Sequence, residues 1–330
     1  MSREKYLVIG SNSFSGASFV ASLLAGGAEV LGVSRSPEAD AVFLPYKWAP
    51  HDRFTFRRLD LNRDLAGVEA AWNSFRPDYV VNFAAQGMVA QSWENPEHWY
   101  RTNTLSMIRL HERLRKYSGL KMFVHASTPE VYGNTSGVIR EDAPFNPSTP
   151  YAISKAACDM NLLALQKAYG FPVALTRAAN VCGPGQSLYR ILPKTILCIL
   201  TGRKLRLEGG GTSVRSFIHI RDVADATTRI CRNGTPGGVY HLSTDRRDTI
   251  RALVEEICRQ LGARLEDCVE ITEARLGQDS AYLLNSAKAR SELGWQPNCS
   301  LCEAIRDTVD WVKKNLSRLQ EMPDQYVHKE

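Results

Sequence analysis

Residues 6–16 read Tyr6-Leu7-Val8-Ile9-Gly10-Ser11-Asn12-Ser13-Phe14-Ser15-Gly16, near the start of a 330-residue chain. The four leading residues are apolar and predict a buried strand, and the periodicity from Ala17 to Leu24 predicts a helix. Glycines in the turn between them permit positive φ and let the backbone approach a phosphate, which the helix N-terminus favours. The order strand, glycine turn, helix predicts the first unit of a dinucleotide-binding sheet.

The same alternation of apolar strands and helices continues through the first half of the chain. Further strands are predicted at 29–33, 54–59, 79–83, 121–126 and 173–177, and helices at 65–76, 99–117 and 152–169. Short apolar runs between helices indicate parallel strands joined by right-handed crossovers. We therefore predict an α/β fold in which residues 1–185 form a Rossmann-type doubly wound parallel sheet, with some later segments returning to it.

The pattern changes after about residue 185. Glycines gather at 209–211 and 234–238, the elements shorten, and helices are predicted at 250–261 and 301–315. We expect residues 186–330 to form mainly a smaller, mixed α/β lobe. The polar end from Ser317 to Glu330 predicts an arm or a loosely held tail.

Composition excludes several classes of protein. The chain is 44% hydrophobic and 23% charged, and its net charge of +6 lacks the aromatic-interleaved basic stripe of a nucleic-acid site. No stretch approaches the ~18 apolar residues of a membrane span, and the chain enters a strand without a cleavable signal, so we expect a cytoplasmic protein. Eight scattered cysteines do not suggest a disulfide framework, and Cys299 and Cys302 lack the further ligands of a metal site.

Candidate cofactor residues follow the ends of the first four strands. They are Gly10, Ser13, Phe14, Ser15 and Gly16 in the turn, Ser34 and Arg35, Asp60 and Leu61, and Ala84, Ala85 and Gln86. Tyr151 and Lys155, farther along the chain, are also expected to contact the cofactor. An acidic residue after the second strand would bind ribose hydroxyls and repel a 2′-phosphate, whereas Arg35 can pair with a phosphate. We predict NAD(P)+ as the cofactor, with NADP+ favoured over NAD+. The alternative for Arg35 is an exposed side chain with no ligand.

Four residues carry the candidate chemistry. Tyr151 and Lys155 lie four residues apart, hence on one face of a helix, and an ammonium beside a phenol lowers the phenol pKa from about 10. Thr128 follows a strand and can hold a substrate oxygen against that phenol. Glu130 supplies an acid/base that alcohol oxidation alone does not require, unless it only satisfies a backbone amide.

With these residues assembled, the chain resembles an extended short-chain dehydrogenase/reductase of the nucleotide-sugar 4,6-dehydratase type. The resemblance rests on the motifs at 82–86, 127–133, 150–155, 177–185, 215–222 and 293–295. The 4-epimerases that resemble this chain usually carry a small residue at the position of Glu130. Pro129 stands where dTDP-glucose dehydratases carry aspartate and GDP-mannose dehydratases carry serine. This departure from the dTDP-glucose pattern brings the chain nearer to the GDP-mannose type.

The resemblance implies that a nucleotide-diphosphate hexose or heptose becomes the 4-keto-6-deoxy sugar nucleotide. C4 is oxidised, water is lost across C5–C6, hydride returns to C6, and the tightly held cofactor is regenerated at each turnover. It also implies that the later lobe binds the sugar nucleotide, with substrate contacts from Thr128, Asn180, Leu192, Pro193, Arg215 and Arg275. The helices at 99–117 and 152–169 correspond to those through which family members form homodimers as a four-helix bundle.

Three alternatives remain open at this point. A UDP-glucuronic acid decarboxylase also combines a glutamate with Tyr151 and Lys155, but no basic residue is evident for a C5 carboxylate. A sugar-nucleotide 4-epimerase is disfavoured by Glu130. An inactive cofactor-binding scaffold is disfavoured by the intact Thr128, Glu130, Tyr151 and Lys155. The apolar faces of the two helices could equally be buried within the same chain, and the sequence leaves the nucleotide and the sugar open.

Overall fold

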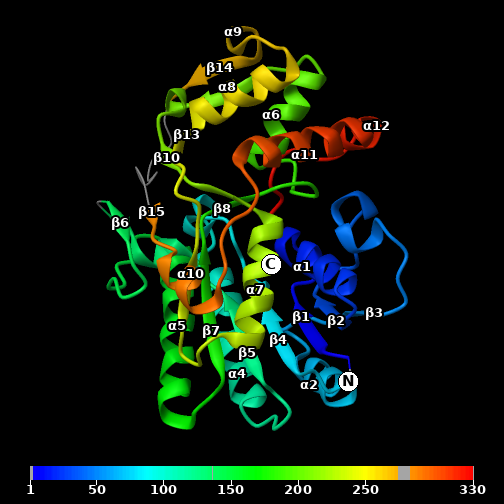
Figure 1. The fold of residues 1–330 in the computed structure, drawn as a ribbon, viewed down its shortest axis with the longest axis vertical. Helices are drawn as coiled ribbons and strands as arrows, with labels where there is room; N and C mark the ends of the chain where they lie inside the picture. Colours follow the sequence, from blue (N-terminus) through cyan, green and yellow to red (C-terminus); the bar gives the residue numbers. More distant parts are fainter. Residues whose placement is uncertain (1–2, 136, 274–282, 330) are drawn as a thin grey trace.

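The computed structural model describes residues 3–135, 137–273 and 283–329. Its centre is a seven-stranded sheet in the order β12-β7-β5-β4-β1-β2-β3 (Figure 1). The strands are β1 Lys5–Ile9, β2 Glu29–Ser34, β3 Phe54–Arg58, β4 Tyr79–Asn82, β5 Met122–Ala126, β7 Val173–Ala178 and β12 Val239–Leu242. Every neighbouring pair is parallel, which confirms the predicted Rossmann-type doubly wound sheet.

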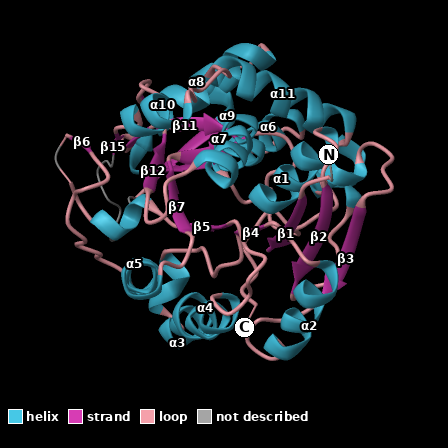
Figure 2. Cartoon of the chain, turned by 60° about the horizontal axis from the view of Figure 1, so that its bottom comes forward, coloured by secondary structure: helices cyan, strands magenta, loops and turns pink. Residues whose placement is uncertain are grey.

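Helices cover both faces of the sheet (Figure 2). One face carries α1 (Phe14–Ala25), α7 (Ile220–Asn233) and α10 (Ala287–Leu293), and the other carries α2 (Leu65–Phe75), α4 (Met107–Leu114) and α5 (Pro150–Tyr169). The alternation of side chains along β1 explains why both layers form. Tyr6 and Val8 belong to the first core and Leu7 and Ile9 to the second, and all four are buried.

The strand order reverses at β1, which lies between β2 and β4. Ligands of open parallel sheets bind in the crevice beyond the carboxyl ends of the strands at such a point. The loops that follow β1, β2 and β4 therefore border one crevice, and those loops carry most of the predicted cofactor residues.

The second lobe, at the top of Figure 1, is the smaller mixed lobe expected from the sequence. Its core lies among α6 (Ile191–Leu200), α8 (Ile250–Leu261) and α11 (Leu301–Lys314). Two ribbons complete it: β9 (Leu205–Glu208) with β14 (Val269–Thr272), and β10 (Val214–Arg215) with β13 (Asp248–Thr249). The remaining helices of this lobe are α9 (Leu265–Cys268) and α12 (Leu316–Leu319).

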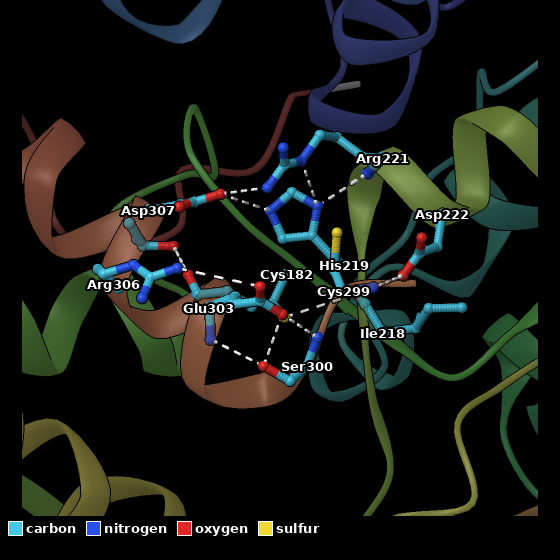
Figure 3. Close-up of polar contacts among 12 residues, drawn as sticks. Cys182, Ile218, His219, Arg221, Asp222, Cys299, Ser300, Glu303, Arg306 and Asp307 are labelled. Carbon is cyan, nitrogen blue, oxygen red and sulfur yellow. Dashed lines mark hydrogen bonds and ion pairs between the residues drawn. The ribbon is translucent and has the colours of Figure 1, made fainter. Parts of the chain in front are cut away.

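Short elements tie the lobes together. β8 (Asn180–Cys182) pairs with β11 (Phe217–His219), and β6 (Val138–Ile139) pairs with β15 (Leu283–Leu284). Figure 3 shows the start of α7, where the Asp222 carboxylate accepts hydrogen bonds from the amides of Asn298 (3.0 Å) and Cys299 (3.1 Å). Arg221 forms an ion pair with Asp307 of α11. The motif at 215–222 thus fastens α11 and the segment before it to the sheet.

The region predicted as one helix at 99–117 is divided. It consists of α3 (Pro96–Trp99), a π-helical segment Tyr100–Ser106 and then α4. Short 3₁₀ helices occur at Ala41–Phe43, Pro45–Lys47, Ala90–Trp93, Pro129–Tyr132 and Gly209–Gly211. All eight cysteines are free. Within the described part of the chain, no helix has the length and apolar character needed to cross a membrane.

Candidate active site

The glycine turn after β1 is packed closely against the loop after β4. Gly10 has φ +83°, and a Cβ at this position would lie 2.5 Å from the Ala84 nitrogen. A Cβ on Gly16 would collide with the Gly10 carbonyl oxygen. Ser13 caps α1 by accepting a hydrogen bond from the Gly16 amide (3.0 Å), so Phe14 and Ser15 form the first turn of the helix. Such a compact turn before a helix N-terminus fits the pyrophosphate of a dinucleotide.

The other predicted cofactor residues lie on the neighbouring strand ends. Ser34 accepts a hydrogen bond from the Asn12 amide (3.0 Å), and Asp60 accepts one from the Asn62 amide (2.9 Å). Leu61 is buried in the core of the α2 and α4 layer. The side chains of Arg35 and Gln86 both donate to the carbonyl oxygen of Lys329, at 3.0 and 2.5 Å, so these two side chains reach one point in the structure.

The π-helical segment Tyr100–Ser106 places a buried side chain that the sequence did not identify. Its buried Asn103 accepts a hydrogen bond from the Gln86 amide (2.8 Å) and donates to the Gln86 carbonyl (3.0 Å) and to Ser154 (3.0 Å). One side chain therefore fixes the loop after β4 against α5. π-Helical turns are rare and occur frequently at functional sites.

The four candidate catalytic residues come from two places that the fold joins. Thr128 follows β5, is buried, and accepts a hydrogen bond from the Glu130 amide (3.3 Å) at the start of a 3₁₀ turn. Tyr151 lies in the first turn of α5, which Thr149 caps, and Lys155 follows one turn later. Lys155 donates to the Ala126 carbonyl (2.8 Å) at the end of β5. This bond connects the Tyr151 and Lys155 helix to the strand that leads into Thr128.

Lys155 has an unusual neighbour in His125. Lys155 Nζ lies 2.9 Å from His125 Nε2, and His125 Nδ1 lies 3.1 Å from Asn82 Nδ2. Lys155 and Asn82 both present nitrogen donors to the His125 ring, but a neutral imidazole accepts only one hydrogen bond. The ring therefore disfavours the third proton on Lys155. Burial acts in the same direction and lowers the pKa of Lys155. Burial also keeps the pKa of His125 well below its usual range, so this ring stays neutral.

A buried ion pair supports the loop that carries Thr128 and Glu130. Arg177 of β7 donates to Asp159 of α5 (2.9 Å), and Ser127 donates to the same carboxylate oxygen (2.6 Å). The Arg177 guanidinium also lies over the ring of Tyr132, 4.6 Å from its centroid. Removing one member of a buried pair leaves the other charge uncompensated, which strongly destabilises a protein. The network therefore connects the loop that carries Thr128 and Glu130 to β7 and α5.

A cavity of about 960 Å³ opens between the second lobe and the loop after β4. Its lining includes the cations Lys194 and Arg206, the aromatic residues Tyr189 and Tyr326, and the acidic residues Glu208, Glu273 and Asp324. Charged and aromatic groups around a large cavity suit a ligand that has both phosphates and a ring.

The predicted substrate residues take different positions. Asn180 begins β8, and its amide donates to the Ser216 carbonyl (3.0 Å). Arg215 lies in β10. Leu192 and Pro193 are buried, whereas Ile191 and Lys194 beside them line the cavity. Arg275 lies outside the described residues. The contacts of these residues with substrate stay predictions.

The chain is similar to known proteins over most of its length. The family model for GDP-mannose 4,6 dehydratase matches residues 7–308. A probable dTDP-glucose 4,6-dehydratase of Sinorhizobium fredii is 31% identical, over 94% of this chain and 93% of that protein.

Solved structures show the same fold. The dTDP-glucose 4,6-dehydratase of Streptomyces venezuelae, solved with NAD bound, has a TM-score of 0.87 at 30% identity, over 95% of this chain and 98% of that chain. The UDP-glucose 4-epimerase of Thermotoga maritima, solved with UDP-glucose, has a TM-score of 0.86 at 28% identity, over 94% and 99% of the two chains. The fold is thus common to a dehydratase and an epimerase and does not by itself separate the two activities. The chain therefore belongs to the GDP-mannose 4,6-dehydratase family and is an extended short-chain dehydrogenase/reductase, a nucleotide-sugar 4,6-dehydratase.

Proposed function

We propose that this enzyme uses Thr128, Glu130, Tyr151 and Lys155 to convert a nucleotide-diphosphate hexose or heptose to its 4-keto-6-deoxy derivative. The observation that carries the proposal is the bond from Lys155 to Ala126, which sets a helix with a Tyr-Lys pair beside a strand end that leads to a carboxylate. A 4-epimerase needs the Tyr151 and Lys155 pair alone, whereas loss of water also needs an acid/base at C5 and C6.

The proposed steps give each group one role. Tyr151 takes the proton of the sugar 4-hydroxyl, and Lys155 beside it favours the phenolate. A bound nicotinamide would supply the acceptor for the C4 hydride and, after loss of water, the hydride for C6, while C5 takes up a proton from solvent. Thr128 donates a hydrogen bond to the new C4 carbonyl oxygen. The C4 carbonyl group makes the C5 proton acidic. Glu130 removes that proton and gives a proton to the departing C6 hydroxyl, so that water leaves.

The experiment that tests this proposal is incubation with a panel of nucleotide sugars and measurement of the product mass. We expect the loss of one water from at least one hexose or heptose nucleotide. Loss of carbon dioxide would instead identify a UDP-glucuronic acid decarboxylase. An isomer of unchanged mass would identify a 4-epimerase, and no product with any sugar would identify an inactive cofactor-binding protein.

We propose NADP+ as the preferred cofactor. Ser34 and Arg35 stand at the end of β2, where an acidic residue would disfavour a 2′-phosphate, and the Arg35 guanidinium is a suitable phosphate donor. The solved dehydratase named above carries NAD, so the preference needs a direct test. Fluorescence titration should give tighter binding of NADP+ than of NAD+, and Arg35→Ala should remove the difference. If NAD+ bound more tightly than NADP+, and Arg35→Ala left this difference unchanged, the proposed preference for NADP+ would be rejected.

The cavity beside the second lobe is our proposed site for the nucleotide diphosphate. Lys194 and Arg206 are the cations in its wall, beside the carboxylates of Glu208, Glu273 and Asp324. Asn180 lies on β8, which ties the lobes together, and Arg215 lies on β10 of the second lobe. Cytoplasmic location, expected from the sequence, is consistent with eight free cysteines.

We also propose a homodimer through a four-helix bundle. The outer faces of the π-helical segment and of α5 expose several apolar side chains, namely Tyr100 (37%), Leu105 (46%), Ile153 (41%) and Met160 (57%). Exposed apolar side chains that gather on adjacent helices are typical of a protein interface. Two such helices from each of two chains would form the bundle.

A further inference from the structure

The last residues of the chain lie across the molecule as an extended segment. Beyond α12, the residues alternate between partly buried and exposed from Glu321 to Lys329. Asp324, Tyr326 and His328 face the protein, whereas Val327 is 64% exposed. Alternation with a period of two is the pattern of an extended strand with one face docked on a surface. Figure 1 shows this end of the chain in red, between the upper lobe and the sheet.

The inward side chains of this segment, 324–329, bind both lobes. Asp324 forms an ion pair with Arg203 (2.8 Å), and the Tyr326 ring meets the Tyr189 ring edge to face, with centroids 5.5 Å apart. At the other end, His328 stacks on Trp99, with centroids 5.0 Å apart and an interplanar angle of 9°. His328 Nε2 also lies 2.9 Å from His98 Nδ1.

Between these anchors, the segment meets residues of both ligand sites. Asp324, Gln325 and Tyr326 form part of the wall of the 960 Å³ cavity. The Lys329 carbonyl oxygen accepts from Arg35 and from Gln86. Arg35 follows β2 and Gln86 follows β4, so they stand on opposite sides of β1 and of the crevice at its end. The segment therefore bridges the two walls of the cofactor crevice and closes one side of the substrate cavity.

We propose that Tyr326 and His328 are positioning residues that hold residues 324–329 as a strap over the bound dinucleotide and slow its release. The inference rests on the proposed function, in which Arg35 and Gln86 border the cofactor. Such retention fits the reaction, because the hydride passes from the sugar to the cofactor and back within one turnover. The same cofactor then serves the next substrate without exchange. A strap anchored on both walls permits sugar nucleotides to exchange while the dinucleotide is retained.

The test uses the full chain with Tyr326→Ala and His328→Ala, and Val327→Ala as the matched control on the outward face. The measurement is the dissociation rate of NAD+ and of NADP+, followed by fluorescence after displacement with excess unlabelled cofactor. Each inward substitution should raise the rate by about three- to tenfold, the range of a lost aromatic pair. Val327→Ala should not change the rate. Thermal melting of each variant checks that the fold is kept, because the anchors lie outside the main cores.

A truncated chain ending at Glu321 gives the decisive comparison. Faster dissociation than in either point variant supports the strap. Slower dissociation or tighter binding would mean that the segment competes with the cofactor, and an unchanged rate would mean that it does not act on the cofactor. Either result overturns the inference and leaves the proposed function intact. Failure of the full-length chain to bind any dinucleotide would overturn the proposed function itself, and the strap with it.

Discussion

The Lys155 amine lies 2.9 Å from the buried ring of His125, although no acid or base at this position is needed for the proposed steps. With Asn82 on the other ring nitrogen, His125 disfavours the third proton on Lys155. His125 of β5 thus affects the charge that the Lys155 amine carries beside Tyr151. This arrangement leads to the first prediction.

His125→Gln should raise the pKa of Lys155, because an amide oxygen can accept a hydrogen bond from the ammonium. The pH at which activity falls through deprotonation of Lys155 then moves upward, and kcat at neutral pH rises by about tenfold or less, because more of Lys155 carries the charge that favours the Tyr151 phenolate. The measurement is the pH profile of kcat for wild type and variant, with thermal melting as the control for folding. An unchanged profile would show that His125 does not act on Lys155.

Asp222→Asn should destabilise the connection between α7 and the segment before α11. The carboxylate accepts from two backbone amides, and an amide side chain would direct its NH₂ group at one of them. We expect the free energy of unfolding to fall by about 1–3 kcal/mol. Urea denaturation measures it. The matched control is Asp225→Asn on the same helix, which removes only an exposed pair with Arg229 and should cost less than about 0.5 kcal/mol.

Acid should destabilise the fold through His111. Burial lowers the pKa of His111 to about 3, so the ring stays neutral in the folded chain and gains a proton in the unfolded chain below about pH 6.5. Stability is therefore kept above pH 6.5 and lost as the pH falls towards 3, with about 2 kcal/mol lost between pH 7 and pH 5. Below pH 6.5, the free energy of unfolding of His111→Gln should depend on pH with a slope that is smaller than in the wild type by the equivalent of one proton. An equal slope in both proteins would contradict this.

Met160→Asp should dissociate the proposed homodimer, because it places a charge in the apolar face of α5. Sedimentation velocity should show a dimer for the wild type and a monomer for the variant. Ile271→Asp is the matched control, since Ile271 is 63% exposed on β14 in the other lobe. A wild-type monomer, or a variant that remains dimeric, would contradict the four-helix bundle.

The sheet could be predicted from the sequence because its signals are local. β1, β2, β4, β5 and β7 are short, mostly apolar runs whose two faces are buried by parallel pairing between helices, and the predicted strands match the observed ones within one residue. The edge strand β3 is half exposed and still matches its predicted bounds within one residue. The division of the helix at 99–117 could not be predicted. It depends on Asn103 reaching Gln86 and Ser154, which are distant in sequence and meet only in the folded chain.

The site shows the same limit. Tyr151 and Lys155 are found by their helical spacing, whereas His125 appears in sequence as one polar residue inside an apolar strand. Leu192 was expected to contact the substrate, and its side chain lies in the core of the second lobe, so that contact stays a prediction. The polar tail was expected as an arm or a loosely held end, and its alternating pattern was too short and too polar to predict the docking of Tyr326 and His328.

The central claim is that Glu130 adds loss of water to an oxidation at C4. The direct measurement is the product mass for the sugar nucleotide that turns over, with the reaction run in deuterium oxide for wild type and Glu130→Gln. The account predicts a wild-type product lighter by one water and carrying one deuterium at C5, and a rate for Glu130→Gln reduced by roughly 10²–10⁴-fold. Dehydration at the wild-type rate by Glu130→Gln, or a wild-type product that has lost no water, would contradict it.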